Sequence, residues 1–152
     1  MDMKFSLALP REALSIPVIR RVLGDALRGL GVAEDCVADI LVAASEACTN
    51  ALQHAPATGD FELAGRVDDD ICVLKITDWG RGLRKAPPPA ASEPADLAES
   101  GRGLRIMRAL VDDFSIDSAP ERGTVVQLRK RLTWRDEAFI RRLDRSLMHS
   151  AG

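Results

Sequence analysis

Residues 33–56 read AEDCVADILVAASEACTNALQHAP, and this stretch decides the fold class. Small and aliphatic side chains recur in it at steps of three and four residues, which is the spacing of one face of an α-helix. These side chains are Val37, Ile40, Leu41, Ala44, Cys48, Ala51 and Ala55. The pattern predicts a helix from about residue 33 to residue 55, and Pro56 ends it.

The segments on either side of this helix predict an α+β protein. The same helical spacing predicts further helices over residues 14–30 and 103–111. Alternating apolar side chains predict strands over residues 4–9, 60–67, 71–77, 114–118 and 124–130. Elements in this order are expected to form a two-layer sandwich, in which helices cover one face of a mixed, mostly antiparallel sheet.

Two further segments are expected to lie outside this sandwich. Residues 83–100 are rich in proline, alanine and serine and have little to bury, which is typical of a mobile loop. Residues 132–152 place apolar side chains on one side of a predicted helix. We therefore expect a main domain over residues 1–131 and a C-terminal amphipathic extension, which packs on its own domain, on a second copy or on a partner.

Composition and charge exclude several functional classes. Of the 152 residues, 46% are hydrophobic and 29% are charged, as in a globular protein that buries a core. With 21 basic against 23 acidic residues there is no broad basic surface, so we expect no direct contact with nucleic acid. No apolar run is long enough to span a membrane. Cys36, Cys48 and Cys72 lack metal or redox spacing and are predicted to be buried thiols, so we expect a cytoplasmic protein.

The central helix carries two polar residues that suit catalysis. Glu46 and Asn50 are four residues apart, so both project from one face, opposite the apolar stripe. A carboxylate there can accept a proton from an attacking hydroxyl or water, and an amide oxygen one turn away can ligate a divalent cation such as Mg²⁺. By itself, such a pair is also compatible with an ordinary solvated helix face.

Glycines follow in three later segments. Asp78 ends a predicted strand and is followed by Gly80 and Gly82, which allow backbone to approach a ligand closely. Gly101, Arg102 and Gly103 precede the short helix that starts at Leu104, where unpaired N–H groups favour a phosphate chain. Thr124 enters the last predicted strand with a hydroxyl that can hydrogen-bond a base. Each of these signals alone is equally typical of a turn or a helix cap.

Taken together and in order, the four segments resemble a known set of motifs. SEACTNALQHA (45–55), DWGRGL (78–83), ESGRGLRIM (99–107) and RGTVV (122–126) resemble the N, G1, G2 and GT boxes of the GHKL, or Bergerat-fold, ATPase superfamily. Within it, the chain looks most like the anti-sigma factors that are also serine-protein kinases of bacterial stress and sporulation switches. The resemblance covers most of the chain, from about residue 5 to residue 130.

The resemblance implies ATP and Mg²⁺ as cofactors and a role for each motif residue. Glu46 would be the general base, Asn50 the magnesium ligand and Asp78 the acceptor for the adenine amine. The implied nucleotide-binding set is Asn50, Asp78, Gly80, Gly82, Gly101, Arg102, Gly103, Leu104 and Thr124. Residues 83–100 would form the lid over the nucleotide.

The same resemblance implies a serine kinase that switches between two protein partners. It would hold a sigma factor and phosphorylate a serine of a small anti-anti-sigma protein of the STAS type. Arg20 and Arg21, on the first predicted helix, are candidate partner-binding residues, and a homodimer is expected.

Two alternatives remain open from the sequence. One is a regulator of the same fold that acts by protein binding without phosphate transfer; retention of both Glu46 and Asn50 argues against it. The other is the catalytic domain of a two-component histidine kinase, although the only histidines are His54 and His149 and neither lies on a preceding phosphoacceptor helix.

Overall fold

A computed structural model describes residues 2–54, 60–78, 103–119 and 123–135. Within these ranges the helices and strands predicted up to residue 130 are confirmed, with differences of one or two residues at their ends. The elements are β1 (Asp2–Pro10), α1 (Ser15–Leu30), α2 (Glu34–His54), β2 (Asp60–Asp68), β3 (Ile71–Asp78), β4 (Asp113–Ala119) and β5 (Gly123–Arg131). Residues 103–110 are also helical.

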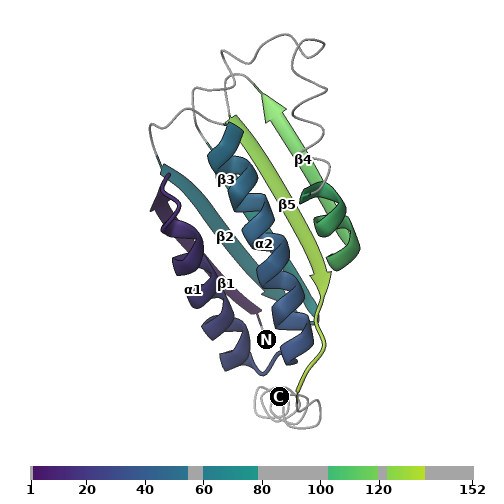
Figure 1. Ribbon diagram of the computed structural model, residues 1–152. Helices are drawn as coiled ribbons and strands as arrows, with labels where there is room; N and C mark the ends of the chain where they lie inside the picture. Colours follow the sequence, from purple (N-terminus) through teal and green to yellow (C-terminus); the bar gives the residue numbers. More distant parts are fainter. Residues whose placement is uncertain (1, 55–59, 79–102, 120–122, 136–152) are drawn as a thin grey trace.

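The strands form one five-stranded sheet in the order β1-β2-β3-β5-β4. All four pairings in this order are antiparallel, so the described sheet is antiparallel at every contact. Figure 1 shows α1, α2 and the helix of residues 103–110 side by side on one face of this sheet. The predicted two-layer α+β sandwich is thereby confirmed.

The core lies between the helices and the sheet face beneath them. Alternate residues of β2 point into it, among them Phe61, Leu63 and Val67, which are at most 2% exposed. They meet one face of α1, where Ile19 and Leu23 are fully buried. Removing a side chain of this size from water contributes roughly 1.5–3 kcal/mol. Apolar burial therefore holds the helices on the sheet and fixes which side of α2 faces away from it.

The chain beyond β5 is tied to the opposite end of the molecule from the α2 C-terminus. Trp134 forms an isolated antiparallel bridge with Val32, and its indole Nε1 donates to Asp70 Oδ1 at 2.9 Å. The Ala33 amide donates to the Thr133 carbonyl at 2.8 Å. The chain is therefore not helical at Thr133 and Trp134, and Trp134 packs on its own domain. The rest of the predicted C-terminal helix, residues 136–152, lies outside the described residues.

Cys36, Cys48 and Cys72 are free, buried thiols, as the sequence predicts. Burial raises the pKa of the Cys48 and Cys72 thiols to about 12. The thiolate, which is the reactive form, is therefore scarce at neutral pH. Among the described helices, none combines the length and the apolar character needed to cross a membrane.

Thiol titration checks this description of the core. We expect no cysteine of the folded protein to react with Ellman's reagent within minutes at pH 8, because all three are buried. Reaction of all three is expected once guanidinium chloride unfolds the chain. Rapid modification of one thiol without denaturant would contradict the packing described for that residue.

Candidate functional site

The start of the helix of residues 103–110 lies directly against two polar residues of α2. A β-carbon added at Gly103 would lie 3.2 Å from Glu46 Oε2. It would also lie 3.6 Å and 3.7 Å from the amide atoms Nδ2 and Oδ1 of Asn50. A contact of 3.2 Å is shorter than a β-carbon normally makes. The lack of a side chain at Gly103 therefore permits Glu46 to lie this close to the helix of residues 103–110. The structure thus joins the first and third sequence motifs in one place.

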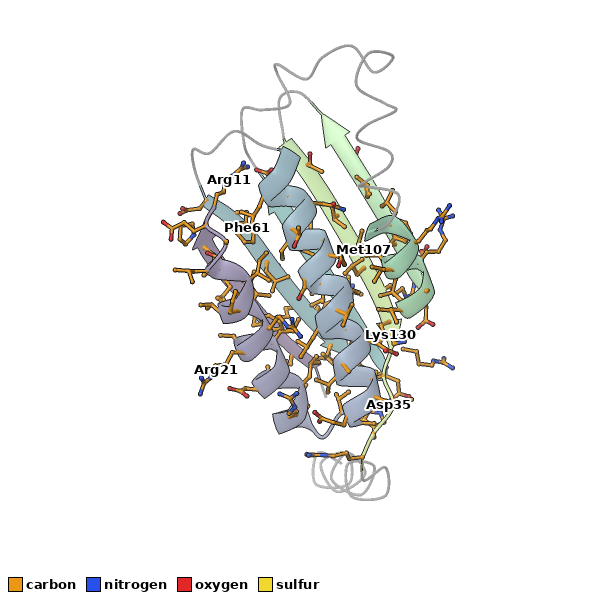
Figure 2. The ribbon with its side chains drawn as sticks, in the orientation of Figure 1. Arg11, Arg21, Asp35, Phe61, Met107 and Lys130 are labelled. Atoms are coloured by element: carbon orange, nitrogen blue, oxygen red, sulfur yellow. The ribbon has the colours of Figure 1, made fainter. Side chains whose placement is uncertain are left out.

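Glu46 and Asn50 are half-buried, although they lie opposite the core-facing side of α2. The helix of residues 103–110 accounts for their partial burial because it packs beside α2. Its Met107 is fully buried in the core, and Leu104 packs against the core from a partly buried position. Figure 2 shows Met107 between this helix and α2. Glu46 and Asn50 therefore do not lie on a fully solvated helix face.

A second polar group lies where β3 ends and β5 begins. Asp78 and Thr124 are direct partners in the antiparallel pairing of β3 with β5. Asp78 is only 4% exposed, and it shares its face of the sheet with its partner on β2, the core residue Phe61. In Figure 1, this end of β3 and β5 is also the end at which α2 finishes. The second and fourth sequence motifs therefore meet on the helix-covered face of the sheet, at the end nearest Asn50.

Arg11 is a member of this group that the sequence analysis missed. It directly follows β1, and its Nη2 forms an ion pair with Asp78 Oδ1. Both side chains are buried, at 4% and 5% exposed. Desolvation lowers the pKa of the Arg11 guanidinium. Arginine side chains nevertheless stay protonated in proteins. No motif in the sequence marks Arg11; it reaches Asp78 only because β1, β2 and β3 pair in the observed register.

Several predicted site residues lie outside the described ranges. Gly80, Gly82, Gly101 and Arg102 are among them, together with the predicted lid over residues 83–100. The described part of the chain contains no cluster of three or more histidine, cysteine, aspartate or glutamate side chains that could hold a metal ion. The three atoms nearest to a β-carbon added at Gly103 are Oε2 of Glu46 and the two amide atoms of Asn50, and their oxygens are of the kind that can ligate a cation.

Arg20 and Arg21 are both exposed on α1. Successive residues of a helix are about 100° apart, so the two guanidinium groups leave α1 in different directions. Helical spacing places Arg21 on the same side as Leu14 and Val18, which are 74% and 44% exposed, and Val22, 39% exposed, lies one helical step beyond Val18 at the edge of this surface. Figure 2 shows Arg21 on the outer side of α1. This surface, the α1 apolar stripe, combines exposed aliphatic side chains with a cation.

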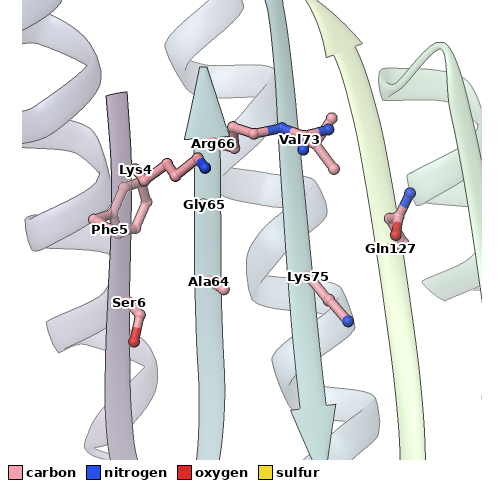
Figure 3. A pocket seen from close by; sticks show the side chains of 9 residues that line it. All are labelled: Lys4, Phe5, Ser6, Ala64, Gly65, Arg66, Val73, Lys75 and Gln127. Atoms are coloured by element: carbon pink, nitrogen blue, oxygen red, sulfur yellow. The ribbon is translucent and has the colours of Figure 1, made fainter. Parts of the chain in front are cut away.

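A separate hollow of about 590 Å³ lies over β1, β2, β3 and β5. Lys4, Arg66 and Lys75 line it, together with smaller residues such as Ser6 and Ala64. Figure 3 views it from the side of the sheet away from the helices. The hollow is therefore distinct from the group formed by Glu46, Asn50 and Gly103.

The fold, with the described residues of the four motifs at one end of its helix-covered face, is that of an ATPase domain. The chain belongs to the histidine kinase-like ATPase domain family, whose model matches residues 9–130.

Among its relatives are two kinds of bacterial regulator. The chain is 31% identical over 139 residues to the anti-sigma F factor of Bacillus subtilis (strain 168), covering 88% of this chain and 92% of that protein. It is 37% identical over 105 residues to the anti-sigma F factor of Bacillus licheniformis, covering 65% of this chain and 72% of the relative. It is 30% identical over 122 residues to the serine-protein kinase RsbW of Bacillus cereus, covering 74% of this chain and 76% of the relative.

Solved structures share the fold. The RsbU and RsbW domains of Rv1364c from Mycobacterium tuberculosis superpose with a TM-score of 0.62 at 24% identity, over 86% of this chain. The match spans only 32% of that longer chain. The SiaB-SiaC complex from Pseudomonas aeruginosa gives a TM-score of 0.56 at 14% identity, covering 85% of this chain and 88% of the matched one.

Proposed function

We propose that this protein is an ATP-dependent serine-protein kinase and an anti-sigma factor. One observation carries the proposal: a β-carbon added at Gly103, in the helix of residues 103–110, would lie within van der Waals distance of Glu46 and Asn50. Phosphoryl transfer needs N–H groups for the phosphates, a base and a metal ligand close together, and the proximity of Glu46 and Asn50 to position 103 supports the proposal. Relatives named as anti-sigma F factor and as serine-protein kinase RsbW support the same function.

In this proposal each of the described site residues has its own role. Glu46 accepts the proton of the substrate serine hydroxyl, and Asn50 supplies an amide oxygen to Mg²⁺. Asp78 accepts a hydrogen bond from the adenine amine, with Thr124 beside it on β5. A magnesium ion bound through one amide oxygen and the phosphates agrees with the preference of Mg²⁺ for oxygen ligands and few protein contacts. When bound, it neutralises charge that develops on the transferred phosphate.

The motif residues outside the described ranges complete the proposed site. Gly80 and Gly82 would shape the base pocket, and Gly101 and Arg102 would act with Gly103 and Leu104 in binding the phosphates. Arg102 would add positive charge at the γ-phosphate, where an arginine stabilises the transition state of phosphoryl transfer. Residues 83–100 would close over the nucleotide as a lid.

We further propose that α1 binds the protein partners. The α1 apolar stripe supports this proposal, because it leaves Leu14, Val18 and Val22 exposed beside Arg21. Exposed aliphatic side chains next to an arginine are typical of protein interfaces. The partners would be a sigma factor and a STAS-type anti-anti-sigma protein, bound by a cytoplasmic homodimer.

Phosphate transfer tests the enzymatic part of the proposal. The protein is incubated with γ-labelled ATP, Mg²⁺ and each purified STAS-type protein of its own organism, and phosphoserine is located by mass spectrometry. We expect one serine of one antagonist to become labelled. Mg²⁺-dependent ATP binding in calorimetry without any transfer would instead establish a non-catalytic regulatory module of the same fold. Absence of ATP binding would overturn the proposal.

A charge reversal tests the partner surface. We expect Arg21→Glu to weaken binding of the sigma factor or the antagonist at least about tenfold, because a carboxylate would repel the acidic partner groups that an arginine is proposed to contact. ATP affinity is expected to stay unchanged because Arg21 lies on the outer side of α1. The matched control is Arg66→Glu, an exposed arginine on β2. Equal effects of the two substitutions would show that α1 is not the docking surface.

A further inference from the structure

The ion pair between Arg11 and Asp78 is buried and joins segments that are distant in the sequence. Asp78 lies at the end of β3 with its side chain on the helix-covered face, beside Thr124. Arg11 comes from the connection between β1 and α1, and β2 separates its strand from β3. Both side chains are almost completely buried, at 4% and 5% exposed. Three segments distant in the sequence therefore converge on one carboxylate.

The connection that carries Arg11 is held by its own hydrogen bonds. The Ser15 hydroxyl donates to the Pro10 carbonyl at 2.7 Å, which closes the loop between the end of β1 and the start of α1. The amide of Glu12 donates to the same carbonyl at 2.8 Å, and the amide of Ser15 donates to the Glu12 carbonyl at 2.9 Å. Ser15 is itself buried. The backbone of Arg11 is therefore fixed on both sides, so its guanidinium is directed at Asp78.

A cation beside Asp78 determines which hydrogen bonds this carboxyl group can make. A buried carboxyl without a cationic partner favours its neutral form, which carries a proton and can donate. An opposite charge nearby favours the ionised form, which only accepts. An ionised carboxylate has several acceptor positions over its two oxygens, so it can pair with an arginine and still accept from an amine.

We propose that Arg11 is a positioning residue that sets the base selectivity of the site by keeping Asp78 an obligate hydrogen-bond acceptor. This inference rests on the proposed nucleotide site at Asp78. The site then accepts a purine with an exocyclic amine, as in adenine, and rejects one with a carbonyl at that position, as in hypoxanthine. Arg11 stays paired while the base is bound, because a base that displaced it would leave a guanidinium buried without its carboxylate.

Comparison of ATP with ITP tests this role, because the two nucleotides differ in that one exocyclic group. Dissociation constants of both, with Mg²⁺, are measured by calorimetry for the wild type, Arg11→Met and Arg11→Lys. We expect the wild type to prefer ATP by at least about a hundredfold, since a site built around a specific hydrogen bond rejects the analogue that lacks it. Arg11→Met should reduce this preference at least about tenfold, and Arg11→Lys should retain most of it because the cation remains.

Two controls separate selectivity from folding. Arg66→Met removes an exposed arginine of β2 and should leave the ATP to ITP ratio unchanged. If circular dichroism shows that Arg11→Met does not fold, Arg11→Gln takes its place, since it keeps a hydrogen-bond donor in the buried position and removes the charge. The same loss of preference is expected of Arg11→Gln.

Other outcomes overturn the inference in distinguishable ways. Equal weakening of ATP and ITP in Arg11→Met, with an unchanged ratio, would assign Arg11 a structural role only. Tighter ATP binding by Arg11→Met would show that the guanidinium competes with the base for Asp78. Failure of the wild type to bind either nucleotide would overturn the proposed function itself, and the role of Arg11 with it.

Discussion

Replacement of Glu46 by glutamine is expected to slow phosphate transfer to the antagonist by about a hundredfold or more, the range typical for loss of a general base. Glutamine keeps the size of the side chain and its place against Gly103, but it cannot take a proton from the serine hydroxyl. ATP affinity should change by less than about threefold, because the proposed base acts on the substrate hydroxyl and not on the nucleotide. Single-turnover transfer of labelled phosphate and calorimetry measure the two quantities.

The control for this substitution is another half-buried glutamate. Glu62 on β2 pairs with Ala8 and Thr77 across the sheet, away from Gly103. Glu62→Gln removes the same charge and should leave the transfer rate unchanged. Transfer by Glu46→Gln at the parent rate would show that the base assignment is wrong, whereas loss of ATP binding in this variant would place Glu46 in nucleotide binding instead.

Introduction of a side chain at position 103 is expected to have the second large effect. A β-carbon there would already lie 3.2 Å from Glu46 Oε2, and the methyl groups of a valine would need the space that Glu46 and Asn50 occupy. We expect Gly103→Val to lower both ATP affinity and phosphate transfer, the latter by about a hundredfold, which is a common effect of misplacing catalytic groups by an ångström. Gly103→Ala should have a smaller effect, because one flexible carboxylate can shift to admit a methyl group.

Gly29 provides a matched control for the glycine at 103. It also lies in a helix, near the end of α1, and an added β-carbon there would meet nothing within 4 Å. Gly29→Val should therefore leave ATP affinity and transfer unchanged, as checked by the same two assays. If Gly103→Val binds ATP and transfers phosphate like the parent, the phosphates do not lie at the start of this helix.

Local patterns predicted most of the elements because each pattern depends only on nearby residues. The stripe from Val37 to Ala51 predicted α2, since helical spacing repeats over a few turns regardless of what packs against it. Alternation predicted β2 and β3 for the same reason. The chain at Thr133 shows the limit of this reasoning. Apolar spacing predicted a helix over residues 132–152, yet the Thr133 carbonyl accepts a hydrogen bond from the Ala33 amide, and this long-range contact keeps the chain at Thr133 out of a helix.

The candidate site was predictable as a set of residues but not as an arrangement. Glu46 and Asn50 share one helix, so their proximity follows from helical spacing alone. Their contact with Gly103 depends on how the helix of residues 103–110 packs beside α2, which no local pattern specifies. The same limit applies to Arg20 and Arg21. The sequence places both on α1, but only the packed helix shows that Arg21 lies beside the exposed Leu14, Val18 and Val22.

The sequence by itself determined the α+β class, the helices and strands up to residue 130 and the buried cysteines, and it supplied the motif residues proposed for the site. The tertiary structure alone decided that Gly103 meets Glu46 and Asn50, and that Arg11 pairs with Asp78. The physical reason is that secondary structure follows from periodic burial within a segment, whereas these contacts depend on strand register and helix packing. Strand register places Arg11, which follows the edge strand β1, beside the carboxylate of Asp78 on β3, although β2 lies between these two strands.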